Sequence, residues 1–329
     1  MSTENVQTVD PSPQQFAGNS ATRIGKRLFA ATRPKFFPAS VLPVLAGSAW
    51  GYSVAGRFDA VVFFLAMLAT VCVHAGANVL NDVGDDIGGT DRQNDKRIYP
   101  YTGGSRFIQT GIMSAATMTR LGVSLLIVAA TTGLVLISMK GLTVLWFGLV
   151  GVILAILYSL GPLRLSAIGL GETSVAIAFG VLPVSGAAWL QSGIVDQPLL
   201  VFSLPISAWV ASILLINGVP DIDADGATGK RTLPVRLGPH RTANLYMSIQ
   251  IAAAAAVLWL AYVGALPMLV PLVPVGLLII AAKARSAIRN GLADRVAMTR
   301  AIEATLAIHT IGSIWLTGAA LYLAFWGNS

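Results

Sequence analysis

The chain has 329 residues and a formal net charge of +7, with 55% hydrophobic but only 11% charged residues. Charged residues make up about a quarter of an average soluble domain, so this composition, with a mean hydropathy of +0.71, excludes an ordinary soluble protein. It predicts an all-α polytopic membrane protein, because helices satisfy their own backbone hydrogen bonds inside a bilayer. The basic excess favours anionic lipid headgroups and phosphorylated substrates over nucleic acid.

Residues 1–20 are polar and rich in Pro, Gln and Ser, with no apolar stretch before a small-residue cleavage site. Such a segment buries too little apolar surface to become ordered, so it predicts a disordered N-terminal tail and not a signal peptide. The rest of the chain, residues 21–329, is predicted to form a single transmembrane domain.

Segments of about 20 apolar residues are long enough to cross the hydrocarbon core as helices. If the N-terminus is cytoplasmic, every one of the 22 lysines and arginines except Arg57 and Lys140 falls on the cytoplasmic side. By the positive-inside rule, this asymmetry predicts a cytoplasmic N-terminus and a C-terminus on the other side of a bacterial-type inner membrane. The nine predicted spans are 38–56, 60–80, 119–138, 142–160, 168–190, 198–217, 243–262, 265–283 and 302–325.

Two aspartate clusters follow directly on predicted spans and open cytoplasmic loops. Carboxylates this close repel one another unless cations neutralise them, and a hard divalent ion with oxygen ligands is the usual partner. At helical spacing, each cluster and its preceding span place three polar side chains on one face. Two such faces would hold Mg²⁺ and a diphosphate, and an attached hydrocarbon tail would lie between the helices. The two faces are Asn78, Asp82 and Asp85, and Asn217, Asp221 and Asp225.

Basic residues accompany both clusters, and such side chains bind phosphate oxygens. An alternative is a calcium-binding EF-hand loop, because residues 221–226 show the start of its alternating pattern. No glutamate stands at the twelfth position of that loop, so the metal-diphosphate site is favoured. The basic residues are Lys96, Arg97 and Arg106 in the first loop, and Lys230 and Arg231 in the second.

The clusters sit in longer motifs, Asn81-Asp82-x-x-Asp85 and Asp221-x-x-x-Asp225, and the second leads into Gly-Lys-Arg-Thr-Leu at 229–233. These motifs resemble the signature loops of the UbiA superfamily of intramembrane prenyltransferases, whose nine-helix bundle agrees with the predicted spans. Further matches resemble its 1,4-dihydroxy-2-naphthoate prenyltransferase branch. They are Arg33-Pro34-Lys35-x-x-Pro38-Ala-Ser40, Tyr158-x-x-Gly161-Pro162 and Gly169-Leu-Gly171-Glu172.

The resemblance implies Mg²⁺-dependent transfer of a polyprenyl group from its diphosphate to 1,4-dihydroxy-2-naphthoate, with loss of CO₂, giving demethylmenaquinol for menaquinone synthesis. Asp82, Asp85, Asp221 and Asp225 would be catalytic as metal ligands together with Asp91, and Arg106 and Lys230 would share the neutralisation of the leaving diphosphate. Glu172 matches a family motif, and His74 lies one helical turn before Asn78, so both are candidates as ionisable residues near spans. The implied substrate-binding residues are Asn78, Asn81, Asn217, Lys96, Arg97, Arg231, Glu172 and His74.

Two alternatives stay open at this point. Val83, Gly84 and Asp86 replace aromatic residues that are usual in the naphthoate branch, which leaves room for another acceptor such as 4-hydroxybenzoate. A secondary transporter for anionic metabolites would also be polytopic. It would place its charges near the bilayer midplane, however, and not in two aspartate-rich cytoplasmic mouths.

Overall fold

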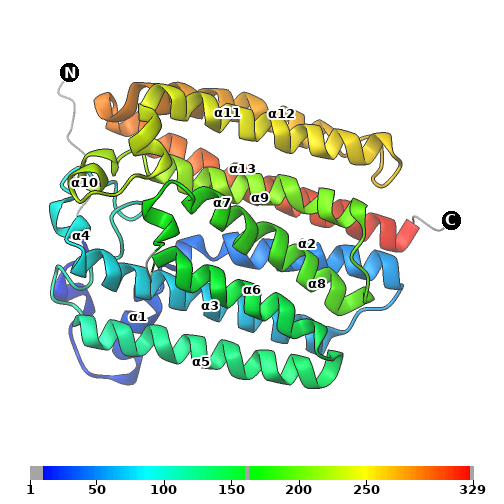
Figure 1. Ribbon diagram of the computed structural model, residues 1–329, viewed down its shortest axis with the longest axis horizontal. Helices are drawn as coiled ribbons and strands as arrows, with labels where there is room; N and C mark the ends of the chain where they lie inside the picture. The colour runs from blue at the N-terminus through cyan, green and yellow to red at the C-terminus, as the bar shows by residue number, and fades with distance from the viewer. Residues whose placement is uncertain (1–9, 160–162, 327–329) are drawn as a thin grey trace.

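The computed structural model describes residues 10–159 and 163–326, and every regular element within these ranges is a helix. Its long helices lie side by side along the longest axis of the molecule (Figure 1). They are α2 (Pro38–Ala55), α3 (Ala60–Ile87), α5 (Ala115–Lys140), α6 (Thr143–Ser159), the continuous run of α7 (Gly171–Ala176), η4 (Ile177–Val181) and α8 (Leu182–Ser192), α9 (Gln197–Asn217), α11 (Leu233–Tyr262), α12 (Leu272–Asn290) and α13 (Arg295–Trp326).

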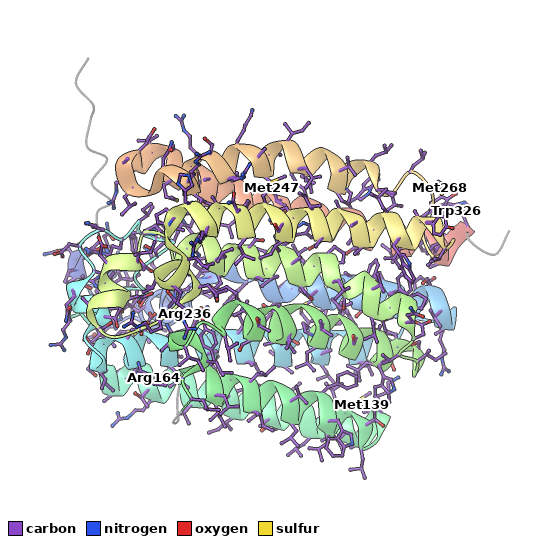
Figure 2. The ribbon with its side chains drawn as sticks, turned by 45° about the horizontal axis from the view of Figure 1, so that its top comes forward. Met139, Arg164, Arg236, Met247, Met268 and Trp326 are labelled. Atoms are coloured by element: carbon purple, nitrogen blue, oxygen red, sulfur yellow. The ribbon has the colours of Figure 1, made fainter. Side chains whose placement is uncertain are left out.

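The short elements gather mainly at one end of this bundle. In Figure 1, α1, α4 and α10 lie at the left end, whereas the C-terminal end of α13 lies at the right. Figure 2 shows Arg164 and Arg236 near the end that carries α10, while Met139, Met268 and Trp326 mark the other end. The short elements are η1 (Pro13–Phe16), α1 (Ala21–Ala31), η2 (Pro34–Phe36), α4 (Thr90–Gln93), η3 (Leu165–Ala167), α10 (Ile222–Ala227) and η5 (Gly291–Ala293).

The bundle is held by close pairs of helices, some successive in the chain and some distant in sequence. Helix α2 packs along α8 and α13, while α3 packs along α5 and α9 along α11. At the α2–α8 contact, a β-carbon added to Gly47 would lie 2.2 Å from the carbonyl oxygen of Val184. Because no side chain fits in that space, glycine at position 47 allows the two backbones to approach.

The structure confirms an all-α protein with several helices suited to span a membrane. Six helices are long and apolar enough by length and composition: α3, α5, α7 to α8, α9, α11 and α13. The other three predicted spans correspond to α2, α6 and α12, which are not long or apolar enough by the same measure. Helix α6 is shorter, α2 is rich in small and weakly polar residues, and α12 carries Lys283, Arg285 and Arg289. The count of nine spans therefore stays a prediction.

Several boundaries differ from the sequence prediction. Helix α3 continues past residue 80 to Ile87, so the first aspartate cluster extends the helix and does not open a loop. Helix α11 starts ten residues before its predicted span, with a break at Gly238, where φ is 68°. Since hydropathy detects only the apolar part of a helix, it misses polar turns that continue beyond the membrane core. Gly161 and Pro162, part of one family motif, lie outside the described residues.

The described part of the N-terminal segment has local structure. Residues 1–9 lie outside the described residues, but within 10–20 the chain forms η1 and contacts the bundle. The Phe16 ring packs edge-on against Phe107, with 4.9 Å between ring centroids, and Phe107 is fully buried. The disordered tail stays a prediction, and composition alone does not indicate this contact between an aromatic ring and another loop.

Candidate active site

The two aspartate clusters meet at the end of the bundle that carries α4 and α10. The last turns of α3 carry Asp85, and α10 carries Asp225. The ammonium nitrogen of Lys230 lies between them, 2.7 Å from Asp85 Oδ1 and 3.3 Å from Asp225 Oδ1. All three side chains are largely buried. The structure thus brings carboxylates from both clusters within reach of one cation.

A second pair of carboxylates faces the loop that follows α4. A backbone N–H, that of Ser105, donates to Asp82 Oδ2 at 2.9 Å, and Arg33 Nη1 lies 3.7 Å from Asp82 Oδ1. A β-carbon added to Gly104 would lie 2.8 Å from Asp91 Oδ2 and 3.0 Å from Asp82 Oδ1. Both oxygens therefore border the same small space, which only a glycine backbone leaves open.

Asn94 joins the two halves directly. Its Nδ2 donates to Asp221 Oδ1 at 2.7 Å, across 127 residues of sequence. Thr90 and Thr228 make a parallel link between the same two loops, with 3.1 Å between their hydroxyl oxygens. The loop that connects α4 to α5 is therefore part of the structure that holds the second cluster in place.

Three buried oxygens here have no hydrogen-bond partner among the described residues: Asp82 Oδ1, Asn94 Oδ1 and Asn217 Oδ1. A buried acceptor without a donor costs about 1–3 kcal/mol, and a hard cation satisfies such oxygens. In the described part of the chain, however, no three His, Cys, Asp or Glu side chains are arranged to hold one ion. Lys230 lies between Asp85 and Asp225, whereas Asp82 and Asp91 border another space and Asp221 accepts from Asn94. The five predicted ligands are therefore two pairs and a single carboxylate, and not one cluster.

Burial and mutual repulsion change the titration of these groups. Burial and the nearby charges of Asp85 and Asp82 raise the pKa of Asp91 to about 8. Burial raises the pKa of Asp221 to about 6, against the hydrogen bond from Asn94. Burial disfavours the charged Lys230 ammonium, but the carboxylates of Asp85 and Asp225 outweigh it and raise its pKa. Burial thus disfavours the anionic form of these carboxylates, and a bound cation would offset that cost.

We expect Mg²⁺ to raise the Tm more at about pH 8.5 than at about pH 6.5. Metal ligands must be deprotonated, and Asp91, with its pKa of about 8, carries a proton below that pH that Mg²⁺ has to displace. Without metal, folding stability changes with pH in the opposite direction. Because the pKa of Asp91 is raised in the folded state, the stability that protonated Asp91 contributes is lost as pH rises through about 8. Thermal unfolding in detergent with and without Mg²⁺ checks this, and Asp91→Asn is expected to remove most of the pH difference. An equal Mg²⁺ effect at both pH values contradicts it.

The other predicted basic residues lie around this centre. Arg97 Nη1 donates to the Asn94 carbonyl at 2.6 Å, and Arg106 donates to the Asp91 carbonyl. The remaining two contact less central groups. Lys96 forms an exposed ion pair with Asp223 at 2.5 Å, and the exposed Arg231 donates its backbone N–H to the Ala167 carbonyl at 2.6 Å.

The polar residues predicted along α3 lie at different depths. Asn81 donates to Asp85 Oδ2 at 3.0 Å and so orients that carboxylate. Asn78 donates to the Thr32 carbonyl at 3.2 Å, which places it at a helix junction. His74 is buried deeper, with Nδ1 3.0 Å from the Ser40 hydroxyl and its ring packed edge-on against Phe179. Glu172 is buried in the first turn of α7.

Sequence reasoning missed three residues that contact the carboxylates: Arg33, Asn94 and Gln109. Gln109 Nε2 lies 3.2 Å from Asp86 Oδ1 and 3.4 Å from Asp91 Oδ2. It lines a cavity of about 400 Å³ beside the aspartates, together with Asp86, Arg92, Arg106 and Ile108. Arg33 could have been identified from its place in the Arg-Pro-Lys motif. Asn94 and Gln109 lie in a loop whose path cannot be predicted from the sequence.

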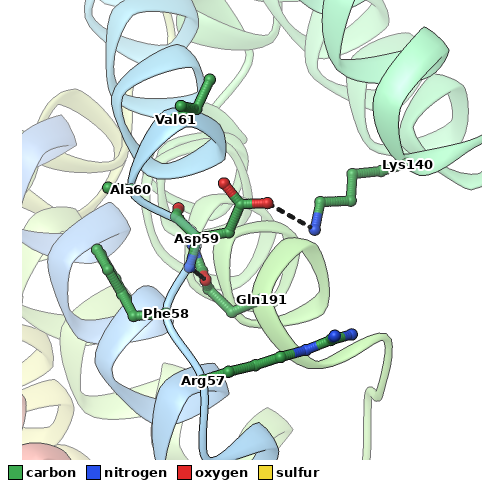
Figure 3. A pocket seen from close by; sticks show the side chains of 7 residues that line it. All are labelled: Arg57, Phe58, Asp59, Ala60, Val61, Lys140 and Gln191. Atoms are coloured by element: carbon green, nitrogen blue, oxygen red, sulfur yellow. Dashed lines mark hydrogen bonds and ion pairs between the residues drawn. The ribbon is translucent and has the colours of Figure 1, made fainter.

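Another cavity, of about 410 Å³, lies at the far end of the bundle (Figure 3). There Lys140 reaches from the end of α5 to Asp59, with 3.2 Å between Nζ and Oδ2. Gln191 exchanges two hydrogen bonds with the Asp59 backbone, at 2.8 and 3.1 Å. These contacts connect the ends of α3, α5 and α8, and they involve none of the residues of the aspartate clusters.

Comparison with known proteins shows the family of the chain. Residues 40–311 match the model of the UbiA prenyltransferase family. The chain is 31% identical to the 1,4-dihydroxy-2-naphthoate octaprenyltransferase of Haemophilus influenzae over 238 residues, 70% of this chain and 75% of that protein. It is 32% identical to the enzyme of the same name from Mycobacterium tuberculosis over 302 residues, 90% of this chain and 96% of that one.

A solved structure shares the fold. It is a UbiA homologue from Archaeoglobus fulgidus bound to GPP and Mg²⁺, with a TM-score of 0.65 at 15% identity, covering 89% of this chain and 99% of that chain. The family model covers most of the chain, the relatives agree with it over two thirds of their length or more, and the described helices have the arrangement of the family. The chain therefore belongs to the UbiA prenyltransferase family and is a multi-pass membrane prenyltransferase.

Proposed function

We propose that this enzyme transfers a polyprenyl group from polyprenyl diphosphate to 1,4-dihydroxy-2-naphthoate, with loss of CO₂, in menaquinone synthesis. The observation that carries the proposal is the Lys230 ammonium held between Asp85 and Asp225, a cation position built from both aspartate clusters. The names of the relatives from Haemophilus influenzae and Mycobacterium tuberculosis support the acceptor. The membrane is a bacterial inner membrane, crossed nine times by one domain with its N-terminus in the cytoplasm.

The residues present fit Mg²⁺, because the buried oxygens of Asp82, Asn94 and Asn217 have no hydrogen-bond donor in the described ranges. Because these carboxylates do not converge on one point, more than one Mg²⁺ ion would be held, by Asp82, Asp85, Asp91, Asp221 and Asp225 with an amide oxygen from Asn217. When bound, Mg²⁺ supplies positive charge that stabilises the departing diphosphate.

Lys230 is the basic residue best placed to bind a phosphate oxygen. Its ammonium is mostly buried at the centre of the carboxylates, so a small movement brings it to any anion that binds there. Asn81 keeps Asp85 oriented, and Asn78 fixes the junction between α3 and the residues before α2. We assign Lys96 and Arg231 to the rim of the site, where they attract anionic substrate. We assign Glu172 and His74 to substrate contacts deeper in the bundle.

The reaction breaks the bond between the first prenyl carbon and the diphosphate oxygen, and the diphosphate leaves with the bonding electrons. The resulting allylic cation is quenched by water unless water is excluded, and the apolar side chains of the helix bundle provide that exclusion. The electron-rich ring carbon that bears the carboxylate then forms the new carbon–carbon bond. The carboxylate departs as CO₂, so atoms and charges balance.

The test is prenyl transfer by purified enzyme in proteoliposomes with labelled polyprenyl diphosphate. We expect a labelled naphthoquinol with 1,4-dihydroxy-2-naphthoate, no product with 4-hydroxybenzoate, and no product when EDTA removes divalent metal. Product from 4-hydroxybenzoate instead overturns the acceptor and keeps the reaction type. Label that crosses the membrane unchanged, with neither acceptor modified, contradicts the proposed reaction and favours a transporter.

A further inference from the structure

We propose that Asp10 is a positioning residue for prenyl transfer. It holds the two arginines, Arg97 and Arg106, that support the segment from Asp91 to Asn94, here named the carboxylate loop. This inference rests on the proposed function. Asp10 lies outside the residues matched by the family model, 40–311, so nothing in the family comparison assigns it a role.

Asp10 contacts both arginines at once. Its Oδ1 and Oδ2 accept from Arg97 Nε at 3.1 Å and Arg97 Nη2 at 2.5 Å, a two-point contact, and Oδ2 lies 3.6 Å from Arg106 Nε. Among the described residues, no carboxylate other than Asp10 forms an ion pair with Arg97 or Arg106. The Arg97, Arg106 and Asp10 side chains are 17%, 10% and 24% exposed. Such partly buried pairs are less screened than surface pairs, so Asp10 offsets the repulsion between two neighbouring guanidinium groups.

The other edges of the same guanidinium groups hold the carboxylate loop. Arg97 donates to the Asn94 carbonyl and Arg106 to the Asp91 carbonyl, so each arginine spans from Asp10 to the backbone of that loop. The Asn94 side chain then reaches Asp221 at 2.7 Å, and the Asp91 carboxylate borders the space shared with Asp82. A short path of contacts thus runs from Asp10 to both aspartate clusters.

This use of the arginines explains their geometry. A guanidinium has five donors in a rigid fork, and the donors of Arg97 point at a carboxylate on one side and a backbone carbonyl on the other. Arg106 donates to a backbone carbonyl, and its Nε, which has no hydrogen-bond partner in the described residues, is near Asp10 as an ion pair only. Phe16 keeps the segment in place, because its ring packs on the buried Phe107 next to Arg106. We infer that Arg97 and Arg106 act through the position of Asp91 and Asn94, and that residues 10–16 complete the support.

The experiment compares wild type, Asp10→Asn, Asp10→Glu and Phe16→Ala in full-length enzyme in proteoliposomes. For Asp10→Asn we expect the Mg²⁺ concentration for half-maximal activity to rise about tenfold and kcat to fall, with KM for the prenyl diphosphate within about twofold, since outer partners of metal ligands change metal affinity by about 10–100-fold. Asp10→Glu is expected to recover much of the loss. Phe16→Ala is expected to shift the Mg²⁺ dependence in the same direction without changing any charge.

Asp196→Asn is the matched control. It also removes one negative charge, but Asp196 caps the first turn of α9, where Asn serves equally well, and it forms no ion pair in the described residues. An unchanged Mg²⁺ dependence in Asp10→Asn overturns the proposal. So does a lower KM for the diphosphate at normal kcat, because Asp10 would then be a competitor of the substrate.

The Mg²⁺-dependent rise in Tm, measured without substrates, separates this proposal from the proposed function. If wild type transfers no prenyl group, the proposed function fails. The inference about Asp10 is still tested by whether Asp10→Asn weakens the Mg²⁺ effect on Tm while its metal-free Tm shows that it folds.

Discussion

Asp225→Asn is expected to lower kcat by about 1,000-fold or more, because one carboxylate of the cation position between the two clusters is lost. The side chain keeps its size, and Lys230 keeps Asp85 at 2.7 Å, so the fold is expected to survive. The substitution removes one negative charge. Because the Asp225 side chain is only 10% exposed and the local dielectric is low, that charge interacts strongly with a bound cation. The measurement is single-turnover transfer to 1,4-dihydroxy-2-naphthoate at saturating Mg²⁺.

Asp223→Asn is the control for that substitution. Asp223 lies two residues earlier on α10, is 68% exposed and pairs only with the exposed Lys96 among the described residues. An exposed ion pair contributes about 0–1 kcal/mol, so we expect activity within about threefold of wild type. Equal losses in the two variants would show that the charge of the whole helix matters and not the position of one carboxylate.

Gly104→Ala is expected to reduce activity by about 100-fold and to weaken Mg²⁺ binding. The new β-carbon would stand 2.8 Å from Asp91 Oδ2 and 3.0 Å from Asp82 Oδ1, so at least one carboxylate must turn away from the shared space. A displacement of about 1 Å in such a site is enough to cost about two orders of magnitude in rate. Activity and the Mg²⁺ dependence of Tm measure the two effects.

Gly111→Ala separates this steric effect from backbone strain. Both glycines have a φ of 72°, where alanine costs about 1–2 kcal/mol, but nothing lies within 4 Å of a β-carbon at Gly111. We therefore expect Gly111→Ala to lower stability by a similar amount and to leave Mg²⁺ dependence unchanged. If both variants lose activity alike, the strain and not the contact with the carboxylates is responsible.

The extension of α3 shows why part of the site was beyond sequence reasoning. Hydropathy ends the second span at residue 80, yet the helix continues to Ile87. Its polar turns are stabilised by Arg92 from the neighbouring α4 and by Lys230, which lies far along the chain. The spacing of Asp82 and Asp85 did indicate one helical face. It could not indicate that Lys230 lies on that face.

The sequence by itself determined the class of protein and the presence of two acidic clusters suited to bind cations. Long apolar runs must become helices in a bilayer, and two aspartate clusters must attract cations, because both conclusions follow from local composition. Only the tertiary structure decided which carboxylates are neighbours. The pairing of Asp85 with Asp225 through Lys230, the link from Asn94 to Asp221 and the contact of Asp10 with Arg97 each join residues more than 80 positions apart. Such contacts depend on how helices pack, and packing is a property of the whole chain that no local pattern encodes.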